Sequence, residues 1–368
     1  MATNTISNRL ISLDAMRGFT IVGMIIVNDP GSWSHVYGPL LHEPWNGITP
    51  TDYVFPFFLF IVGVSVALAY QKRIDDGSEK GPLVRKIVIR SLKIFVLGLF
   101  LWLWPKFDFG GIRYAGVLQR IALVFLPCAL LYLYTDWRTQ LKIAIGILVG
   151  YWIIMAYVPI PGIGAPDLSV PEKNWAHYLD NLLLPGRLWQ GTWDPEGFLS
   201  TLPSIATGMI GMLIGKMILT IRDSYEKLTH LFLAGFIMLV IGGIWKWYFP
   251  LNKNIWTSSY VMVMAGMCTL TLATFIYIVD LKGYDRWTTL GRVFGANSIT
   301  AYVLAGMLTA VFYSDIFIGV GLNQVWMESI PTLGIAPKMA SLLYALLYVG
   351  IIFIPTYILY KKKIFIKV

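Results

Sequence analysis

Charged residues are scarce in this chain of 368 amino acids, and cysteine is almost absent. Asp, Glu, Lys and Arg make up 13% of the residues and hydrophobic residues 57%, and the mean hydropathy is +0.65. A soluble globular domain carries about 25% charged residues, so this composition predicts an integral membrane protein instead. The two cysteines, Cys128 and Cys268, both fall within apolar runs, which argues against a disulfide framework and indicates packing residues.

Motifs of several enzyme and transporter classes are missing as well. The chain has no Walker A loop, no HExxH, no GxGxxG and no GxSxG, and the nearest approach to the last is GVSVA at residues 63–67, which lacks the final glycine. ATP-driven transport, zinc proteolysis and α/β-hydrolase chemistry are therefore excluded, and we expect no metal site. No nucleic-acid-binding motif is present, and the first residues do not have the pattern of a cleaved signal peptide.

Apolar segments recur along the whole chain, and each is long enough, at about 18 to 25 residues, to cross the hydrocarbon core of a bilayer as a helix. None of them shows the alternating period of a barrel strand. Because a bilayer disfavours unpaired backbone groups, the sequence predicts an all-α, polytopic membrane protein that forms a single domain over residues 1–368. We predict ten membrane-spanning helices, at residues 10–28, 52–71, 87–104, 117–134, 141–158, 198–221, 231–249, 256–281, 296–318 and 339–360.

The distribution of basic residues predicts the orientation of these helices. With the N-terminus inside, 21 of the 29 Lys and Arg residues lie in cytoplasmic stretches, as the positive-inside rule requires. Both termini are then cytoplasmic, and the loop between the first two helices faces outward. The net charge of +9 follows from this topology and from contact with anionic lipid head groups, so it does not indicate a nucleic-acid partner.

Polar residues gather in that first outward loop, in LLHEPWNGITPTDYVFP at residues 40–56. The imidazole of His42 can exchange a proton near neutral pH, and the carboxylate of Asp52 can fix its tautomer. Asn28 ends the first predicted helix at a similar depth. These three are the candidate catalytic residues. The alternative is that His42 is a loop histidine bonded to water, while Asp52 and Asn28 only cap the adjacent helices.

The longest stretch between predicted helices, residues 159–197, contains six prolines and three tryptophans. We expect it to form an ordered cap over the outer mouth. It ends in Trp193, Asp194 and Glu196, and a flat ring beside carboxylates suits a sugar. Helix capping and an interfacial aromatic belt explain the same residues equally well. The predicted substrate-binding residues are Trp45, Asn46, Trp193, Asp194, Glu196 and Lys253.

Further polar residues lie inside apolar surroundings. Asp14 and Arg17 are one helical turn apart near the cytoplasmic end of the first helix, where they can pair, although Arg17 could instead bind a phosphate. Gln119, Arg120 and Asn297 lie at depths where polar side chains normally face the bundle interior or a water-filled cavity. The residues alone leave open whether this polar interior serves an enzyme or a transporter.

Six motifs, in order, resemble the heparan-α-glucosaminide N-acetyltransferase family of membrane acyltransferases, including its bacterial relatives. They are RLISLDAMRGFTIVGMIIVNDPG (9–31), LLHEPWNGITPTDYVFPFFLFIVG (40–63), GVLQRIAL (116–123), WDPEGFLSTLPSIATGMIG (193–211), PLNKNIWTSSYV (250–261) and FGANSIT (294–300). The resemblance implies transfer of an acetyl group from cytoplasmic acetyl-CoA to the amino group of a terminal glucosamine held on the other side. It also implies a homodimer, and for a bacterial member a multi-pass protein of the inner membrane.

The resemblance assigns roles to some of these residues. His42 falls on the family's active-site histidine, Asn28 and Asp52 on polar residues of the same site, and Arg120 and Glu196 on two further shared motifs. We assign Arg17, Gln119, Arg120 and Asn297 to acetyl-CoA.

The chain begins almost at its first helix, whereas the lysosomal enzyme has a large luminal domain there, so we expect a smaller amino sugar or an envelope glycan as acceptor. Direct transfer with His42 as base and an acetyl-histidine intermediate both remain open. The alternative function is an amino-sugar permease that uses the same polar path.

Overall fold

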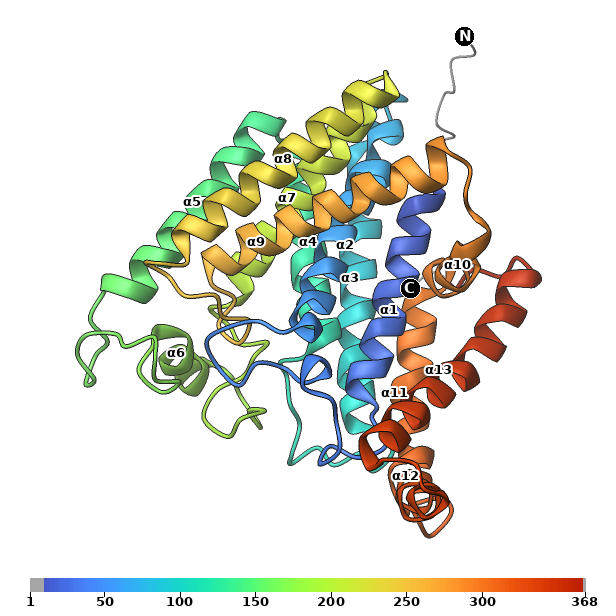
Figure 1. Ribbon diagram of the computed structural model, residues 1–368. Helices are drawn as coiled ribbons and strands as arrows, with labels where there is room; N and C mark the ends of the chain where they lie inside the picture. Colours follow the sequence, from blue (N-terminus) through green and yellow to red (C-terminus); the bar gives the residue numbers. More distant parts are fainter. Residues whose placement is uncertain (1–9, 367–368) are drawn as a thin grey trace.

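Long apolar helices form the body of the protein, as Figure 1 shows for the computed structural model, which describes residues 10–366. The backbone N–H and C=O groups of a helix bond to one another, and such internal pairing is required in a membrane because no water is present to bond them. The described residues contain two isolated β-bridges and no sheet. The long helices are α1 (Ile11–Asn28), α2 (Val54–Asp75), α3 (Lys80–Leu103), α4 (Val117–Tyr134), α5 (Trp137–Tyr157), α7 (Thr201–Thr220), α8 (Ser224–Trp245), α9 (Ser258–Phe275), α11 (Ser298–Phe312) and α13 (Pro337–Lys361).

The membrane-spanning helices confirm the all-α, polytopic class. In the described part of the chain, eight helices are long and apolar enough to cross a bilayer. A ninth span results if the bent pair of Arg286–Ala296 and Ser298–Phe312, which meet at 73°, is one crossing. Helix α3 is 24 residues long but carries basic residues through its first half, so it is not apolar enough to be counted among these eight helices. The predicted number of ten is reached only if the bent pair and α3 both cross.

Shorter elements connect the long helices. They are η1 (Gly38–Leu40), η2 (Pro50–Tyr53), α6 (Trp175–Leu183), the π-helical turn η3 (Ile276–Leu281), η4 (Arg286–Thr288), α10 (Thr289–Ala296), α12 (Leu322–Ser329) and η5 (Ile330–Leu333). Residues 159–197, where no periodic pattern was evident, therefore contain one short helix, α6. Its role as a cap stays a prediction.

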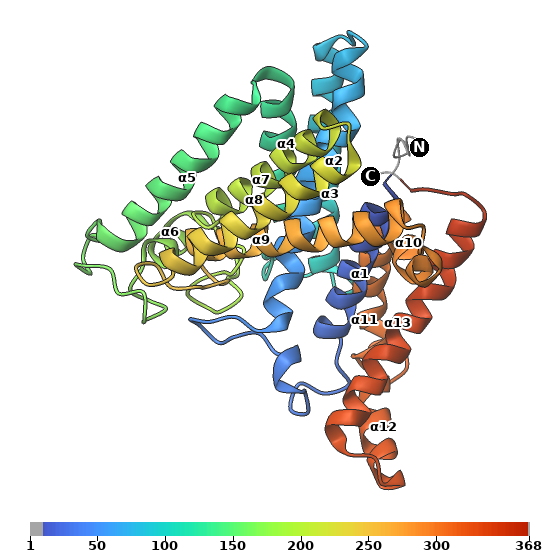
Figure 2. The same ribbon diagram turned by 45° about the horizontal axis from the view of Figure 1, so that its top comes forward.

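Glycines allow two helix pairs to approach at backbone distance. A Cβ added at Gly63 of α2 would lie 1.9 Å from the carbonyl oxygen of Gly208 in α7, and one at Gly18 of α1 would lie 1.7 Å from that of Gly291 in α10. Such contacts bring helices together where lipid offers no hydrophobic driving force. In both views α5 and α8 lie on one side of these central helices and α13 on the other (Figures 1 and 2). The two cysteines are buried free thiols, as expected.

The bundle has two chemically different ends. Ile11 and Asp14 from the start of α1 share a cavity with Lys361, the last residue of α13, and with Lys363 just after it, so both ends of the described chain lie together at what we call the terminal end. The opposite end, the loop end, consists of residues 29–53, 104–116, 158–200, 246–257 and 313–336 (Figure 1). Helix α3 carries the chain from the terminal end back to the loop end.

Candidate active site

The side chains of His42 and Asp52 form a hydrogen-bonded pair at the loop end. Asp52 is buried, and its Oδ1 lies 2.7 Å from Nδ1 of His42, whose side chain is 40% exposed. A carboxylate can only accept, so Nδ1 carries the proton and Nε2 is left as the basic nitrogen. The pair was predicted as a possibility from spacing alone, and the fold brings the two side chains into contact.

Local structure around η2 explains why Asp52 is so well placed. Its second oxygen, Oδ2, accepts hydrogen bonds from the backbone N–H of Thr49 at 2.9 Å, the hydroxyl of Thr49 at 3.1 Å and the backbone N–H of Glu43 at 3.1 Å. Thr49 and Asp52 form a capping box at the start of η2. The hydroxyl of Tyr260 in α9 donates to the backbone oxygen of Asp52 at 2.5 Å. Asp52 thus both caps the helix and orients the imidazole.

Lys253, in the connection between α8 and α9, reaches the same imidazole. Its Nζ lies 3.2 Å from both ring nitrogens of His42. Burial lowers the pKa of Lys253, while Glu196 and Asp52 oppose the shift. The neighbouring Asn252 is buried and donates to the side-chain oxygen of Asn46 at 3.0 Å, which ties this connection to the His42 loop.

His42 and Lys253 line a cavity of about 540 Å³ at the loop end. Asn28, the last residue of α1, contributes an exposed amide to its wall. The other polar and aromatic residues on the wall are Trp33, His42, Glu43, Thr51, Phe55, Arg113, Trp189, Gln190, Glu196, Lys253 and Asn254. The cavity therefore combines an imidazole, carboxylates and aromatic rings, which are groups suited to an amine-bearing sugar.

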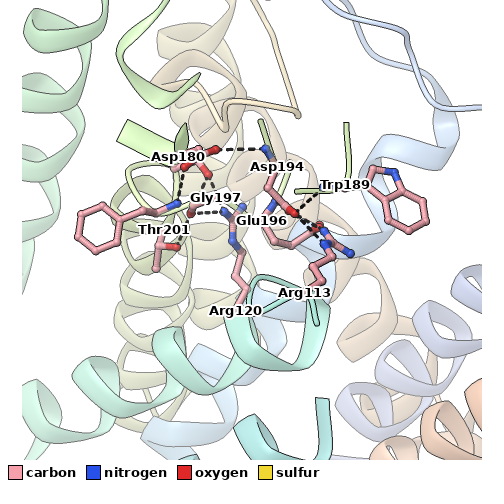
Figure 3. Close-up of polar contacts among 10 residues, drawn as sticks. Arg113, Arg120, Asp180, Trp189, Asp194, Glu196, Gly197 and Thr201 are labelled. Atoms are coloured by element: carbon pink, nitrogen blue, oxygen red, sulfur yellow. Dashed lines mark hydrogen bonds and ion pairs between the residues drawn. The ribbon is translucent and has the colours of Figure 1, made fainter. Parts of the chain in front are cut away.

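A buried ion-pair network stands behind this cavity (Figure 3). Arg113 donates from Nε and Nη2 to the two oxygens of Asp194, each at 2.6 Å, and from Nη2 to Glu196 at 2.6 Å. The Asp194 and Glu196 carboxylates raise the pKa of Arg113 although burial opposes this, so the guanidinium stays charged. Asp194 is fully enclosed and serves as the anchor, whereas Glu196 also lines the cavity.

Two further charged residues fix the turn that carries Glu196. Figure 3 shows Arg113 and Trp189 on one side of residues 194–197 and Asp180 on the other. Asp180 of α6 accepts from the backbone N–H groups of Asp194 at 3.2 Å and Phe198 at 2.8 Å, and burial raises its pKa to about 7. Arg120 donates to the carbonyl oxygen of Gly197 at 3.0 Å.

Three of the predicted substrate-binding residues hold the loops together. The rings of Trp45 and Trp193 meet edge to face at 5.3 Å, and only 8% of Trp193 is exposed. The indole N–H of Trp45 and the amide of Asn46 both donate to the carbonyl oxygen of Leu168, at 2.9 and 3.0 Å. Two exposed indole rings line the cavity instead. They belong to Trp33, which is 59% exposed, and to Trp189, which is 56% exposed and whose ring centre lies 5.0 Å from the guanidinium carbon of Arg113.

A second cavity, of about 360 Å³, extends from the first toward the bundle interior. Asn28, Arg113 and Trp189 line both, and Gln119 lines the inner one. Asp29 also contributes, and burial raises its pKa to about 8. The sequence did not single out Asp29, because an acid next to a helix end usually serves as a solvated cap.

A third cavity, of about 200 Å³, lies at the terminal end and contains two arginines, Arg17 and Arg90. Arg17 pairs with Asp14 at 3.1 Å, as expected, and also donates to the hydroxyl of Ser65 at 2.8 Å. Asn297 lines this cavity at the break between α10 and α11, and its amide bonds the backbone of Ile364 and Ile366.

The four residues assigned to acetyl-CoA are therefore not in one place. Arg17 and Asn297 line the terminal-end cavity, Gln119 the inner cavity, and Arg120 packs beneath the turn at Gly197. Arg90 belongs to a basic stretch at residues 72–93 that the sequence places near the acetyl-CoA entry, but it was not singled out, because a basic residue in the first half of a predicted span is typical of an interfacial anchor.

Comparison with known proteins gives one consistent result. Residues 9–242 match the family described as Heparan-alpha-glucosaminide N-acetyltransferase, catalytic. The chain is similar to the heparan-alpha-glucosaminide N-acetyltransferase of Mus musculus, at 28% identity over 98% of this chain and 61% of that protein. Its similarity to the Homo sapiens protein of the same name is 29% identity over 80% of this chain and 52% of that protein. The chain thus spans between half and two thirds of the length of these relatives.

Proposed function

Because the chain belongs to the heparan-alpha-glucosaminide N-acetyltransferase family, we propose that it transfers an acetyl group from acetyl-CoA to the amino group of a glucosamine-type sugar. The single observation that carries this proposal is the His42–Asp52 pair, whose Nδ1 to Oδ1 distance is 2.7 Å, on the wall of the loop-end cavity. An imidazole oriented by a buried carboxylate is suited to act as a general base for an amine nucleophile. Glu196 on the same wall offers an acceptor for ammonium or hydroxyl groups.

Direct transfer is the scheme that we propose for this site. The amine nitrogen of the sugar attacks the thioester carbonyl carbon while Nε2 of His42 takes a proton from that nitrogen. The C–S bond then breaks, and CoA leaves as a thiol that receives the proton from His42. The exposed amide of Asn28 lines both loop-end cavities and supplies a donor for the oxygen that develops negative charge. In the alternative scheme the acetyl group passes first to His42 and then to the amine.

Acetyl-CoA is proposed to enter from the terminal end. Its phosphates require cations, and Arg17 and Arg90 are the charged residues on the cavity there. The excess of Lys and Arg in the loops of that end favours a cytoplasmic location, with His42 on the opposite side. We further propose a single catalytic domain that works as a homodimer in a bacterial inner membrane, as the family resemblance implies.

Replacing Arg17 with alanine should weaken acetyl-CoA binding by about tenfold or more, since a charge-assisted hydrogen bond is worth roughly 1.5–3 kcal/mol. Arg90→Ala should have a similar effect. Calorimetry on the purified protein in nanodiscs measures both. Arg85→Ala on the same α3 is the matched control, because Arg85 is exposed and lies outside the cavity. Equal weakening by Arg85→Ala would show that only overall charge matters and would remove Arg17 and Arg90 from the donor site.

Trp189→Ala should raise the acceptor KM by about three- to tenfold, the value of one aromatic contact, and leave acetyl-CoA affinity unchanged. Trp193→Ala is the comparison variant. Because Trp193 is buried against Trp45, its loss should lower the melting temperature instead. Steady-state kinetics with varied glucosamine, together with thermal unfolding, separates the two effects. If Trp193→Ala alone raised the acceptor KM, the stacking ring would be Trp193, as first predicted from sequence.

Acetyl transfer by purified protein in nanodiscs, which enclose no compartment, distinguishes an acetyltransferase from a permease. Purified protein in nanodiscs, given acetyl-CoA and glucosamine, should release N-acetylglucosamine and free CoA in equal amounts. A nanodisc encloses no compartment and a permease does not acetylate its substrate, so a permease would yield neither product. Absence of both products from protein that binds glucosamine would contradict the proposal.

A further inference from the structure

An amine of the protein itself lies against the imidazole of His42 in this structure. Nδ1 is bonded to Asp52, which leaves Nε2 as the base, and Nζ of Lys253 lies 3.2 Å from Nε2 and 3.2 Å from Nδ1, against the face of the ring. A general base must come within about 2.6–3.2 Å of the proton-bearing atom that it serves. Lys253 therefore satisfies the distance that an acceptor amine would have to satisfy.

The charges around Lys253 are those that an amino sugar would meet. Asp52 and Glu196 favour its charged form, whereas burial, followed by Arg120, disfavours it, and the pKa of Lys253 is lowered as a result. A larger fraction of this amine is therefore unprotonated at neutral pH than for an exposed lysine. Only the unprotonated form has the lone pair that an acyl acceptor needs.

The backbone on both sides of Lys253 is fixed, so its amine stays near His42. Asn254 donates to the carbonyl oxygen of Pro44 at 3.1 Å, and the backbone N–H of Trp256 bonds the carbonyl oxygen of Lys253 at 3.1 Å. With the buried Asn252 tied to Asn46, the connection is anchored on the His42 loop from both sides. Only side-chain rotation can take Nζ away from the imidazole.

We propose that Lys253 occupies the acceptor-amine position and is itself acetylated by acetyl-CoA when no acceptor is bound. This inference rests on the proposed acetyl transfer. An entering sugar amine displaces Nζ and protects it, whereas prolonged exposure to acetyl-CoA alone converts Lys253 into a neutral amide. Unlike an acetylated sugar, this amide is part of the chain and cannot leave the site, so the modified protein is inactive.

The reaction balances without any further reagent. Nζ of Lys253 forms a bond to the thioester carbonyl carbon, the C–S bond breaks, and the electron pair of that bond stays on the CoA sulfur. His42 takes the proton from the nitrogen and passes it to the thiolate. The products are Nζ-acetyl-lysine at position 253 and CoA thiol.

Peptide mass spectrometry after incubation with acetyl-CoA tests the proposal. We expect one acetyl group on Lys253. It should be stable to hydroxylamine, whereas an acetyl group on the imidazole of His42 would be removed by this reagent. Lys173 and Lys246 are exposed lysines of the same end and serve as internal controls. Lys253 should be acetylated about 10²-fold faster than either, since a general base contributes at least that factor, and His42→Ala should abolish the difference. Glucosamine should slow the modification.

Pre-incubation with acetyl-CoA should also cause a time-dependent loss of activity in the wild type. Lys253→Arg, compared with its own rate at time zero, should show no such loss, because a guanidinium forms no stable amide here. If glucosamine is acetylated but Lys253 is modified no faster than Lys173 and Lys246, this inference is wrong and the proposed function stands. If neither glucosamine nor Lys253 receives an acetyl group, both are wrong.

Discussion

Replacing His42 with alanine should lower kcat by about 10²- to 10⁴-fold, the range typical of a general base. The protein should still fold and bind acetyl-CoA, because the imidazole is 40% exposed and its removal leaves no buried void. Steady-state kinetics and calorimetry in nanodiscs measure the two quantities separately. His230→Ala is the control, since His230 is an exposed residue of α8 near the terminal end.

A second variant refines the test of His42. Asp52→Asn should lower kcat less than His42→Ala, because the imidazole remains but its tautomer and orientation are no longer fixed. Wild-type turnover by His42→Ala would contradict both catalytic schemes.

Arg113→Ala should reduce the free energy of unfolding by about 3–5 kcal/mol, the usual cost of removing one partner from a buried ion pair. The carboxylate of Asp194 is fully enclosed and that of Glu196 is 9% exposed, so Asp194 would lose its cation with no exposure to water and Glu196 with little. Arg113→Lys should recover part of the loss but not all of it, since an ammonium cannot make the bidentate contact with Asp194.

Thermal or denaturant unfolding in detergent measures this effect. Arg187→Ala is the matched control, because Arg187 is an exposed arginine of the adjoining loop, and we expect its stability to stay within about 0.5 kcal/mol of wild type. If Arg113→Ala had the same free energy of unfolding as Arg187→Ala, the ion-pair network behind the cavity would contribute no net stability. Glu196 would then have to be held by the bonds of Asp180 and Arg120 alone.

Hydrophobic length predicts the long helices well and their ends less well. Residues 117–134 were predicted and are the bounds of α4, because Gly116 precedes the apolar run and Thr135 and Asp136 follow it. Helix α3 begins at Lys80 instead of residue 87, since a helix continues into water wherever charged residues tolerate it. The short helix α6 and the 73° break at Asn297 depend on tertiary contacts and leave no periodic signal.

The candidate site divides in a similar way. His42 and Asp52 could be paired from sequence because a capping box and a ten-residue spacing are local features. Arg113 could not be placed, since a single arginine in a loop gives no sign that it will be enclosed by two carboxylates 81 and 83 residues away. Composition likewise cannot tell the exposed ring of Trp189 from the buried ring of Trp193.

Sealed vesicles that keep the two substrates apart provide the most direct test of acetyl transfer across the membrane. Acetyl-CoA is enclosed inside vesicles containing the protein, and glucosamine is added outside only. We expect N-acetylglucosamine to accumulate outside while CoA accumulates inside, and neither to form with His42→Ala. Product that forms only when both substrates share one side, or uptake of unmodified glucosamine into the vesicles, would contradict transfer from the terminal-end cavity to an amine at His42.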